Sequence, residues 1–240
     1  RYALANSLNI PAVEVMNKVG VNEAIETAER FGITTLGQRN RFGLSLVLGS
    51  GEVKLTEMVG AYGVFANEGK KVSPTTILEI KNKFDKKIYS YDPQENTVIS
   101  EDIAFLISSI LSDNKARSEV FVNALTISRP AAVKTGTTQS YKDSWTLGYT
   151  PSLAVGVWVG NNDGRPMDRV AGSMGAAPIW KDLMEHFLAG SPVEAFRMPE
   201  GVVDSTVCRT IRSENKLEEN GETKIEYTTS TTSYKEYFLA

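Results

Sequence analysis

The sequence is poor in the side chains from which disulfide frameworks and metal centres are built. Its 240 residues include one cysteine, Cys208, and one histidine, His186. A disulfide within the chain and a cysteine-based zinc site are therefore excluded, as is a metal ion held by a histidine cluster. A mechanism that needs two histidines is excluded for the same reason. We expect neither a metal ion nor an organic cofactor in this protein.

Net charge is also small. The chain has 26 Lys and Arg residues against 29 Asp and Glu residues, so its net charge is −3. It lacks the basic excess of a nucleic-acid-binding domain, and we expect no nucleic-acid partner. No apolar run approaches the ~18 residues of a membrane-spanning helix. The 41% of hydrophobic and 23% of charged residues are typical of an ordinary globular protein.

The beginning of the chain indicates a fragment. The chain starts at Arg1 rather than methionine, and residues 2–5 have the character of the last turn of a helix. We therefore expect the 240 residues to be part of a longer protein. A leader or membrane anchor would then lie outside them.

The first half of the chain is predicted to be mainly helical. Apolar side chains recur at helical spacing over residues 11–19, 22–31 and 56–66. Residues 77–91 alternate apolar and polar positions around a charged turn, which predicts an exposed hairpin whose lysines form a solvated face. Ser100 is expected to cap a further amphipathic helix.

The second half changes to the alternating pattern of β-strands. Strands are predicted over residues 131–135, 145–149 and 153–159. An amphipathic helix is predicted over 176–188, with His186 as a partly exposed structural residue. The predicted buried stripe of that helix consists of Trp180, Leu183, Met184, Phe187 and Leu188. Together the two halves predict an α+β fold, with an antiparallel sheet flanked by helices.

Residues 201–240 have a different composition. Ser, Thr, Glu and Lys dominate, and little apolar surface is available to offset the entropy of ordering the chain. We predict a polar C-terminal tail or linker that follows a domain covering residues 1–200.

Two short motifs have side chains that could carry chemistry. Lys134-Thr135-Gly136-Thr137 ends a predicted strand, and Ser7-Leu8-Asn9 follows a helical turn. The first motif offers an ammonium and hydroxyls beside a glycine that admits a substrate backbone. An extended peptide could add to that strand edge through main-chain hydrogen bonds. The second motif offers a hydroxyl that can relay a proton and an amide that can bind a peptide group.

Each motif also has a purely structural interpretation. Ser7 can simply end one helix, and Asn9 can cap the next. Lys134 can be an edge-strand lysine that discourages aggregation. Trp145 and Trp158 in the neighbouring strands are most simply packing residues.

In their wider context the two motifs are similar to S-x-N and K-T-G, which together with S-x-x-K are the three motifs of the penicillin-recognising serine acyltransferases. The chain resembles the transpeptidase domain of class A penicillin-binding proteins, the bifunctional peptidoglycan synthases. The resemblance runs from residue 1 to about 200, in family order, through residues 6–13, 61–69, 132–138, 143–160 and 176–180. It implies the penicillin-binding-protein and serine β-lactamase-like transpeptidase fold, with the N-terminal part missing.

The implied activity is peptidoglycan cross-linking by D,D-transpeptidation. A serine attacks the D-Ala-D-Ala amide of a stem peptide, and D-alanine leaves. An amine of a neighbouring stem peptide then takes the acyl group from the acyl-serine intermediate. Ser7 would help to pass the proton toward the leaving amine, and Lys134 would supply positive charge to that relay and to the substrate carboxylate. A β-lactam would acylate the same serine.

The resemblance also implies four residues that bind substrate. Asn9 would hold the stem-peptide amide. Thr135 and Thr137 would contact the carboxylate and the strand-like substrate beside Gly136. The backbone N–H of Thr137 would be one donor of the oxyanion hole.

The S-x-x-K segment, which contains the family's nucleophilic serine, does not precede Ser7. The pattern occurs at residues 112–115 and 213–216, but both follow S-x-N and are therefore in the wrong order. We expect the nucleophile upstream of Arg1, and we expect this chain by itself to be inactive.

The resemblance further implies an extracytoplasmic protein, in the periplasm or on the outer face of the cytoplasmic membrane. It would be anchored by a membrane segment outside this chain and preceded by a separate glycosyltransferase domain. Its implied partners are stem peptides, lipid-linked precursors, β-lactam antibiotics and cell-wall synthesis proteins. Two alternatives stay open: a degenerate, non-catalytic domain that binds stem peptide or a partner, and a serine β-lactamase-like hydrolase. The hydrolase would need a water-activating glutamate, and none stands out between Ser7 and Lys134.

Overall fold

The computed structural model describes residues 1–138, 141–168, 170–219 and 222–240, with the backbone alone over 214–219 and 222–226. The chain divides into two compact units, Arg1–Arg197 and Met198–Ala240. Each unit is described by itself.

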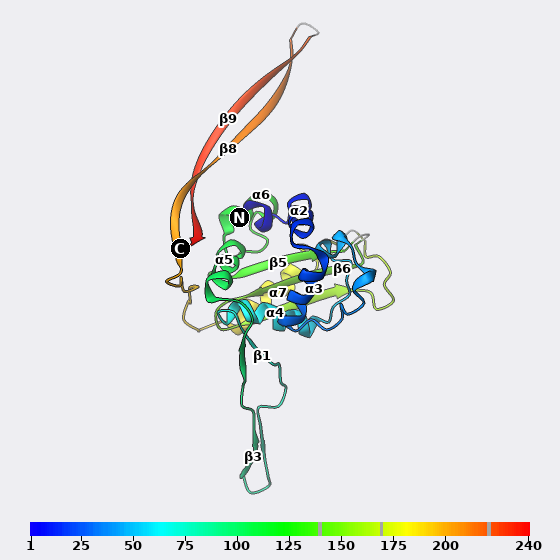
Figure 1. Cartoon of the computed structure of the whole chain (residues 1–240), viewed down its shortest axis with the longest axis vertical. Coiled ribbons are helices and arrows are strands. Elements are labelled where there is room, and N and C mark those ends of the chain that lie inside the picture. Colours follow the sequence, from blue (N-terminus) through cyan, green and yellow to red (C-terminus); the bar gives the residue numbers. More distant parts are fainter. Residues whose placement is uncertain (139–140, 169, 220–221) are drawn as a thin grey trace. The chain divides into compact units, whose positions relative to one another are not determined.

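A three-stranded antiparallel sheet is the centre of the first unit (Figure 1). Its strands are β5 (Ala132–Thr137), β6 (Asp143–Tyr149) and β7 (Ala154–Gly160), in the order β5-β6-β7. The register pairs Lys134 with Leu147 and Trp145 with Trp158. The three strands predicted in this part of the sequence are confirmed, with ends shifted by one or two residues.

Helix α7 (Ala176–Phe187) covers one face of the sheet. Trp180 and Met184 are fully buried against Val133 and Val157. The predicted helix is confirmed, but the prediction that Phe187 is buried is wrong, because its side chain is 62% exposed. The buried stripe runs through positions 177, 180, 184 and 188, and this leaves Phe187 at its border.

Helices α4 (Leu55–Ala66) and α5 (Glu101–Leu111) cover the other face. The fully buried Tyr149 stacks on Phe65, and its hydroxyl lies 2.8 Å from Ser108 Oγ. α4 comes so close to β7 that a Cβ on Gly156 would lie 2.5 Å from a methyl carbon of Val59. The unit therefore has three layers, with the sheet between two helical layers.

The remaining helices of this unit come mostly from the N-terminal part of the chain. They are α1 (Tyr2–Ala5), α2 (Asn9–Val19), α3 (Val21–Phe31), the 3₁₀ turns η1 (Arg39–Arg41) and η2 (Leu44–Leu48), and α6 (Asn114–Phe121). The helices predicted over 11–19, 22–31 and 56–66 correspond to α2, α3 and α4. The predicted cap of α5 is confirmed, because Ser100 Oγ accepts a hydrogen bond from the N–H of Ile103.

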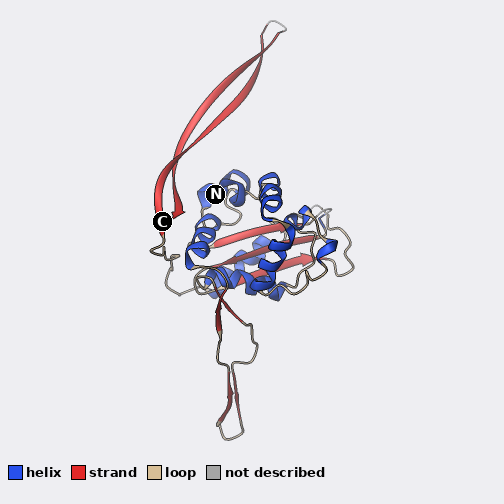
Figure 2. Ribbon diagram, in the orientation of Figure 1, coloured by secondary structure: helices blue, strands red, loops and turns tan. Residues whose placement is uncertain are grey.

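Two small antiparallel ladders lie between α4 and α5 in the sequence. β1 (Lys70–Val72) pairs with β4 (Glu95–Thr97), and β2 (Glu79–Lys81) pairs with β3 (Lys87–Ser90). The second ladder is the predicted hairpin, whereas the first was not predicted. In Figures 1 and 2, β2 and β3 lie beyond β1 and β4, away from the sheet β5–β7.

The segment predicted to be a polar tail or linker contains regular secondary structure. β8 (Val202–Glu219) and β9 (Glu222–Leu239) form a long antiparallel ladder, drawn in red in Figure 2. These strands were not predicted, although Thr, Val, Ile and Tyr, which recur in both, have high β-propensity. Cys208 lies in β8, where its thiol is exposed.

Candidate active site

Ser7 and Lys134 meet in the folded chain, although 127 positions separate them. The ammonium Nζ of Lys134 donates a hydrogen bond to Ser7 Oγ at 2.6 Å and another to the carbonyl oxygen of Thr135 at 2.6 Å. Lys134 makes no ion pair in the part of the chain that the structure describes. The hydroxyl of Ser7 is exposed, so a substrate can reach it.

The turn that ends α1 fixes the position of Ser7. Ser7 has a left-handed backbone with φ 58°, which is uncommon for a residue with a side chain. The preceding residue, Asn6, is buried and ties the turn to α6, because its Nδ2 donates to the carbonyl oxygen of Ala116 at 2.8 Å. Such unfavourable backbone geometry persists where surrounding contacts enforce it, and it is enriched at functional sites.

The surroundings of Lys134 also tune its charge. Burial lowers its pKa from 10.5 to about 8, because the ammonium loses water. The group remains mostly protonated at neutral pH, yet it gives up a proton far more readily than an exposed lysine. Lys134 can therefore supply positive charge and exchange a proton with its neighbour Ser7.

β5 presents a free edge beside this pair. In the described residues β5 is hydrogen-bonded to β6 on one side only. The main-chain groups on its other side can pair with an extended peptide, as the sequence analysis expected. The predicted contact between a peptide substrate and this strand edge is therefore geometrically possible.

The side chains of Thr135 and Thr137 lie on the opposite face of β5 from Lys134. Thr137 Oγ1 accepts a hydrogen bond from the N–H of Gly172 at 2.8 Å, and a Cβ on Gly172 would lie 3.1 Å from Cβ of Thr135. Successive side chains of a strand point to opposite faces, which explains the separation. The structure brings Ser7 and Lys134 together but turns the two threonine side chains toward Gly172. Their role as carboxylate ligands stays a prediction.

Gly172 packs tightly beneath the end of β5. A Cβ at this position would lie 2.8 Å from the carbonyl oxygen of Gly136 and 3.0 Å from that of Trp145. The carbonyl of Gly172 accepts a hydrogen bond from Thr146 Oγ1 at 3.2 Å. A glycine is therefore required where the chain crosses beneath the strands and enters α7.

Asn9 is the first residue of α2, and its side chain is exposed. The cap position belongs to Leu8, and no side-chain hydrogen bond caps the helix. The interpretation of Asn9 as a helix cap is therefore wrong, whereas its role toward a substrate amide stays a prediction.

The sequence analysis missed Asp143 as an organiser of the β5–β6 connection. Its carboxylate accepts hydrogen bonds from Trp158 Nε1 and Thr138 Oγ1, each at 2.8 Å. The N–H of Asp143 in turn donates to Thr138 Oγ1 at 2.9 Å. These bonds fix the backbone just after the Lys134–Thr137 motif. The available signal was an aspartate two residues before Trp145, at the start of the strand.

The two internal S-x-x-K sequences belong to different units of the chain. Ser112 is the C-cap of α5, and Lys115 is an exposed residue of α6. Ser213 belongs to β8 in the second unit. No hydrogen bond joins Ser112 or Lys115 to Lys134 in the described chain.

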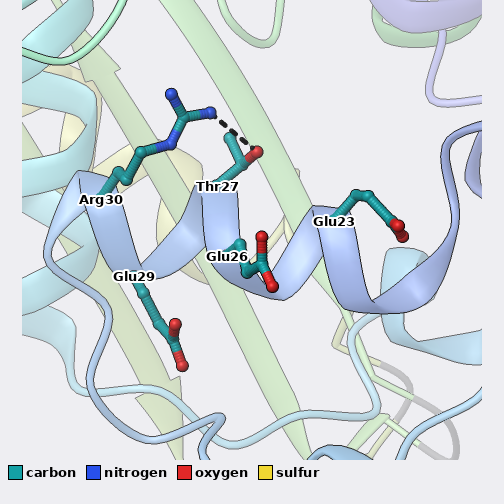
Figure 3. A pocket seen from close by; sticks show the side chains of 5 residues that line it. All are labelled: Glu23, Glu26, Thr27, Glu29 and Arg30. Atoms are coloured by element: carbon teal, nitrogen blue, oxygen red, sulfur yellow. Dashed lines mark hydrogen bonds between the residues drawn. The ribbon is translucent and has the colours of Figure 1, made fainter.

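A surface hollow lies elsewhere, along α3 (Figure 3). Its lining residues are Glu23, Glu26, Thr27, Glu29 and Arg30, which all come from one helix. Arg39 from η1 pairs with Glu26 and Glu29. Because no other element contributes to its lining, the hollow lacks the converging groups of a binding site.

Among the residues that the structure describes, no group of three or more His, Cys, Asp or Glu residues is arranged so that it could hold a metal ion. No helix in the described part of the chain is both long enough and apolar enough to cross a membrane.

The geometry and the sequence agree with a known family. Residues 1–185 match the model of the penicillin binding protein transpeptidase domain. The chain belongs to this family, and the family resemblance and fold class inferred from the sequence are confirmed.

Individual relatives support the assignment. The chain is 38% identical over 209 residues to penicillin-binding protein 2D of Bacillus subtilis, and the alignment covers 83% of this chain and 29% of the relative. It is 32% identical to penicillin-binding protein 1A of Aquifex aeolicus, covering 83% of this chain and 27% of the relative. The structure of PonA1 from Mycobacterium tuberculosis in complex with penicillin V aligns with a TM-score of 0.72 and 26% identity, over 81% of this chain and 57% of that one. The chain thus spans less than a third of the length of the Bacillus subtilis and Aquifex aeolicus relatives.

Proposed function

We propose that the protein to which this chain belongs cross-links peptidoglycan by D,D-transpeptidation through an acyl-serine intermediate. The observation that carries the proposal is the 2.6 Å hydrogen bond from Lys134 Nζ to Ser7 Oγ. It joins the S-x-N and K-T-G motifs beside the free edge of β5. Membership of the transpeptidase family supplies the reaction class.

In the acylation step, a serine oxygen attacks the carbonyl carbon of the D-Ala-D-Ala amide. The C–O ester bond forms, the C–N bond breaks, and D-alanine leaves as the free amine. The proton released by the serine passes through Ser7 and Lys134 to the nitrogen of the leaving group. The nucleophile belongs to an S-x-x-K segment outside the 240 residues.

In the transfer step, an amine of a second stem peptide attacks the ester carbonyl. An amide bond forms, the ester C–O bond breaks, and the proton from the amine returns to the serine by the same route. Positive charge at Lys134 stabilises the negative charge that develops in both steps. The overall result is one new cross-link and one free D-alanine.

The stem peptide pairs with the free edge of β5 as an added strand. Asn9 binds a substrate amide, and the backbone of Gly136 and Thr137 borders the scissile bond, with the N–H of Thr137 as an oxyanion donor. The substrate carboxylate is bound near Lys134, and Thr135 and Thr137 border the strand-like substrate through the main chain of β5. Gly172 and Asp143 hold this end of β5 in place, which supports the assignment.

The wider setting is part of the same proposal. The full-length protein is a bifunctional synthase with an upstream glycosyltransferase domain, anchored in the membrane and active on its extracytoplasmic side. It takes lipid-linked precursors and stem peptides as substrates, works with cell-wall synthesis proteins, and is acylated by β-lactams.

The test uses the full-length protein and a fluorescent penicillin. The labelled peptide is identified by mass spectrometry, and we expect the label on a serine upstream of Arg1. A label on Ser112 or Ser213 would contradict the motif assignment. The absence of a label on folded protein would favour the non-catalytic binding domain, and rapid release of hydrolysed penicillin would favour the hydrolase.

The role of Lys134 is tested by its replacement with alanine in the same protein. We expect the second-order acylation rate to fall more than ten-fold, since a lost proton-transfer group typically costs about 10²–10⁴-fold. Lys115→Ala, which removes an exposed lysine from α6, is the matched control and should leave the rate unchanged. Equal rates for Lys134→Ala and the parent protein would remove Lys134 from the site.

A further inference from the structure

The hairpin formed by residues 77–91 exposes an unusual amount of apolar surface. β2 and β3 pair with each other, and in the described part of the chain no other strand or helix packs extensively against them. The exposed fractions of its large apolar side chains range from 42% to 78%. These side chains are Ile77, Leu78, Ile80, Phe84, Ile88 and Tyr89.

The apolar side chains occupy both faces of the hairpin. Ile80 and Tyr89 are paired across the ladder and therefore share one face. Ile88 neighbours Tyr89 in the same strand and therefore points to the other face. A protein partner that packs on a hairpin covers one face, whereas a lipid interface surrounds an inserted tip on all sides.

The tip of the hairpin is an ordered turn. Asn82 Oδ1 accepts hydrogen bonds from the N–H of Phe84 at 2.9 Å and of Lys86 at 3.1 Å, and Asp85 has a left-handed φ of 60°. This geometry presents Phe84 outward with 78% of its surface exposed. Lys83 Nζ lies 5.0 Å from the centre of the Phe84 ring. The turn therefore presents an aromatic ring and a cation together.

The charge of the hairpin is opposite to that of the chain. Residues 77–91 have four lysines and two acidic residues, a net charge of 4 − 2 = +2, whereas the whole chain has −3. The two acidic side chains are already paired: Glu79 with Lys81 and Lys87, and Asp85 with Lys81. The remaining lysines, Lys83 and Lys86, make no ion pair within the described chain and are the ones nearest to Phe84 in sequence.

We propose that this hairpin docks on the surface of a membrane that contains anionic lipids. Lys83 and Lys86 bind the phosphates of the lipid headgroups, and Phe84 enters the boundary between headgroups and acyl chains. The solvated-face interpretation of these lysines accounts for their charge but not for the six exposed apolar side chains beside them. The proposal does not depend on the acyl-transfer reaction, because the hairpin lies apart from Ser7 and Lys134.

The test measures sedimentation of the whole 240-residue chain with lipid vesicles at low salt. We expect binding to vesicles made of equal parts of phosphatidylglycerol and phosphatidylcholine, and little binding to phosphatidylcholine alone. The double variant K83A/K86A should bind about 30-fold more weakly, because each lysine at an anionic surface contributes about 1 kcal/mol. Added salt should weaken binding of the parent protein, since it screens this attraction.

The control is K18A/K115A, which removes the same charge from exposed positions on α2 and α6. It should bind like the parent protein. Equal weakening by the two double variants would reduce the effect to net charge and overturn the proposal. The same conclusion would follow if the parent protein fails to bind the anionic vesicles at low salt.

Phe84→Ser tests insertion separately from charge. We expect a loss of binding of about ten-fold, because an aromatic side chain no longer leaves water. Phe84→Trp provides a direct readout, since the emission of an inserted tryptophan shifts to shorter wavelength when vesicles are added. Unchanged binding of Phe84→Ser, or an unshifted emission of Phe84→Trp, would contradict insertion. The substitutions of Lys83, Phe84 and Lys86 lie in an exposed turn, and those of Lys18 and Lys115 lie at exposed helix positions. Circular dichroism verifies that each variant is folded.

Discussion

Replacement of Lys134 by methionine should stabilise the protein slightly at neutral pH, although it removes the ammonium from the site. Burial lowers the pKa of Lys134 from 10.5 to about 8, so the folded chain holds this proton less tightly than the unfolded chain does. Methionine is unbranched and flexible, and it can fill a largely buried position without a charge. The substitution therefore removes an unfavourable buried charge.

The magnitude follows from the pKa and from the contacts that are lost. The fall from 10.5 to about 8 corresponds to at most ~3.4 kcal/mol, since one pKa unit equals about 1.4 kcal/mol. Methionine also lacks the hydrogen bonds of Nζ to Ser7 Oγ and the Thr135 carbonyl, and each bond from a charged donor contributes at least about 1.5 kcal/mol. We expect the free energy of unfolding of Lys134→Met at pH 7 to exceed that of the parent by at most ~0.4 kcal/mol.

The dependence on pH has a defined sign. Between pH 8 and 10.5 the unfolded chain binds more protons at this lysine than the folded chain, so the stability of the parent rises across that window. Below pH 8 the destabilisation is present in full, and above pH 10.5 both states are neutral and it is absent. Lys134→Met has no ammonium at this position, so its stability does not change with pH for this reason. The amount by which its free energy of unfolding exceeds that of the parent should therefore disappear as the pH rises from 8 to 10.5.

The assay is urea denaturation of the two proteins at a series of pH values that spans the window. Other groups that titrate there, such as tyrosines, are common to both proteins and cancel in the difference. Lys115→Met, at an exposed position of α6, should show no pH-dependent difference from the parent. Parallel curves for Lys134→Met and the parent would refute the reasoning, because Lys134 would then not be a destabilising buried cation.

Four further substitutions test the packing of the first unit. Gly172→Ala should destabilise the protein by about 1–3 kcal/mol, because the new methyl group would collide with the carbonyl of Gly136. It should also slow acylation of the full-length protein. An unchanged melting temperature would contradict the predicted collision. Ser108→Ala should lower the free energy of unfolding by about 2 kcal/mol, because it leaves the buried hydroxyl of Tyr149 without a partner. Tyr149→Phe should lower it by only about 1 kcal/mol, because Ser108 still donates to the Ala104 carbonyl. Equal losses in urea denaturation would refute this difference. Asp113→Ala should cost about 1 kcal/mol, since the side chain caps α6, and unfolding curves that coincide with the parent's would exclude that role.

Much of the fold could be predicted from the sequence because apolar spacing determines which faces of the elements are buried. The strands β5–β7 and the helices α2, α3, α4 and α7 follow from period alone. The pair β1–β4 was missed because each strand has three residues, too few for a period to show. The ladder β8–β9 was missed because its exposed strands lack the apolar alternation of a buried face, while their β-propensity is high.

Of the candidate site, only the residues that belong to the two motifs could be predicted from the sequence. The motifs placed Ser7 and Lys134 in one site, and the structure brings their side chains into contact. They did not show that Thr135 and Thr137 point away from Lys134, which depends on the strand's alternation and on Gly172 lying beneath it. The role of Asp143 could not be predicted either, because it depends on one partner in β7 and another in the connection that follows β5.

The single cysteine of the chain offers a practical consequence. Cys208 is exposed on β8, in the second unit, whereas all residues of the proposed site belong to the first. A maleimide dye would therefore label these 240 residues at one defined position outside the site. In a full-length protein whose other cysteines are replaced, this dye and a second one carried by a fluorescent penicillin would report the distance between the two units in solution and whether substrate analogues change it.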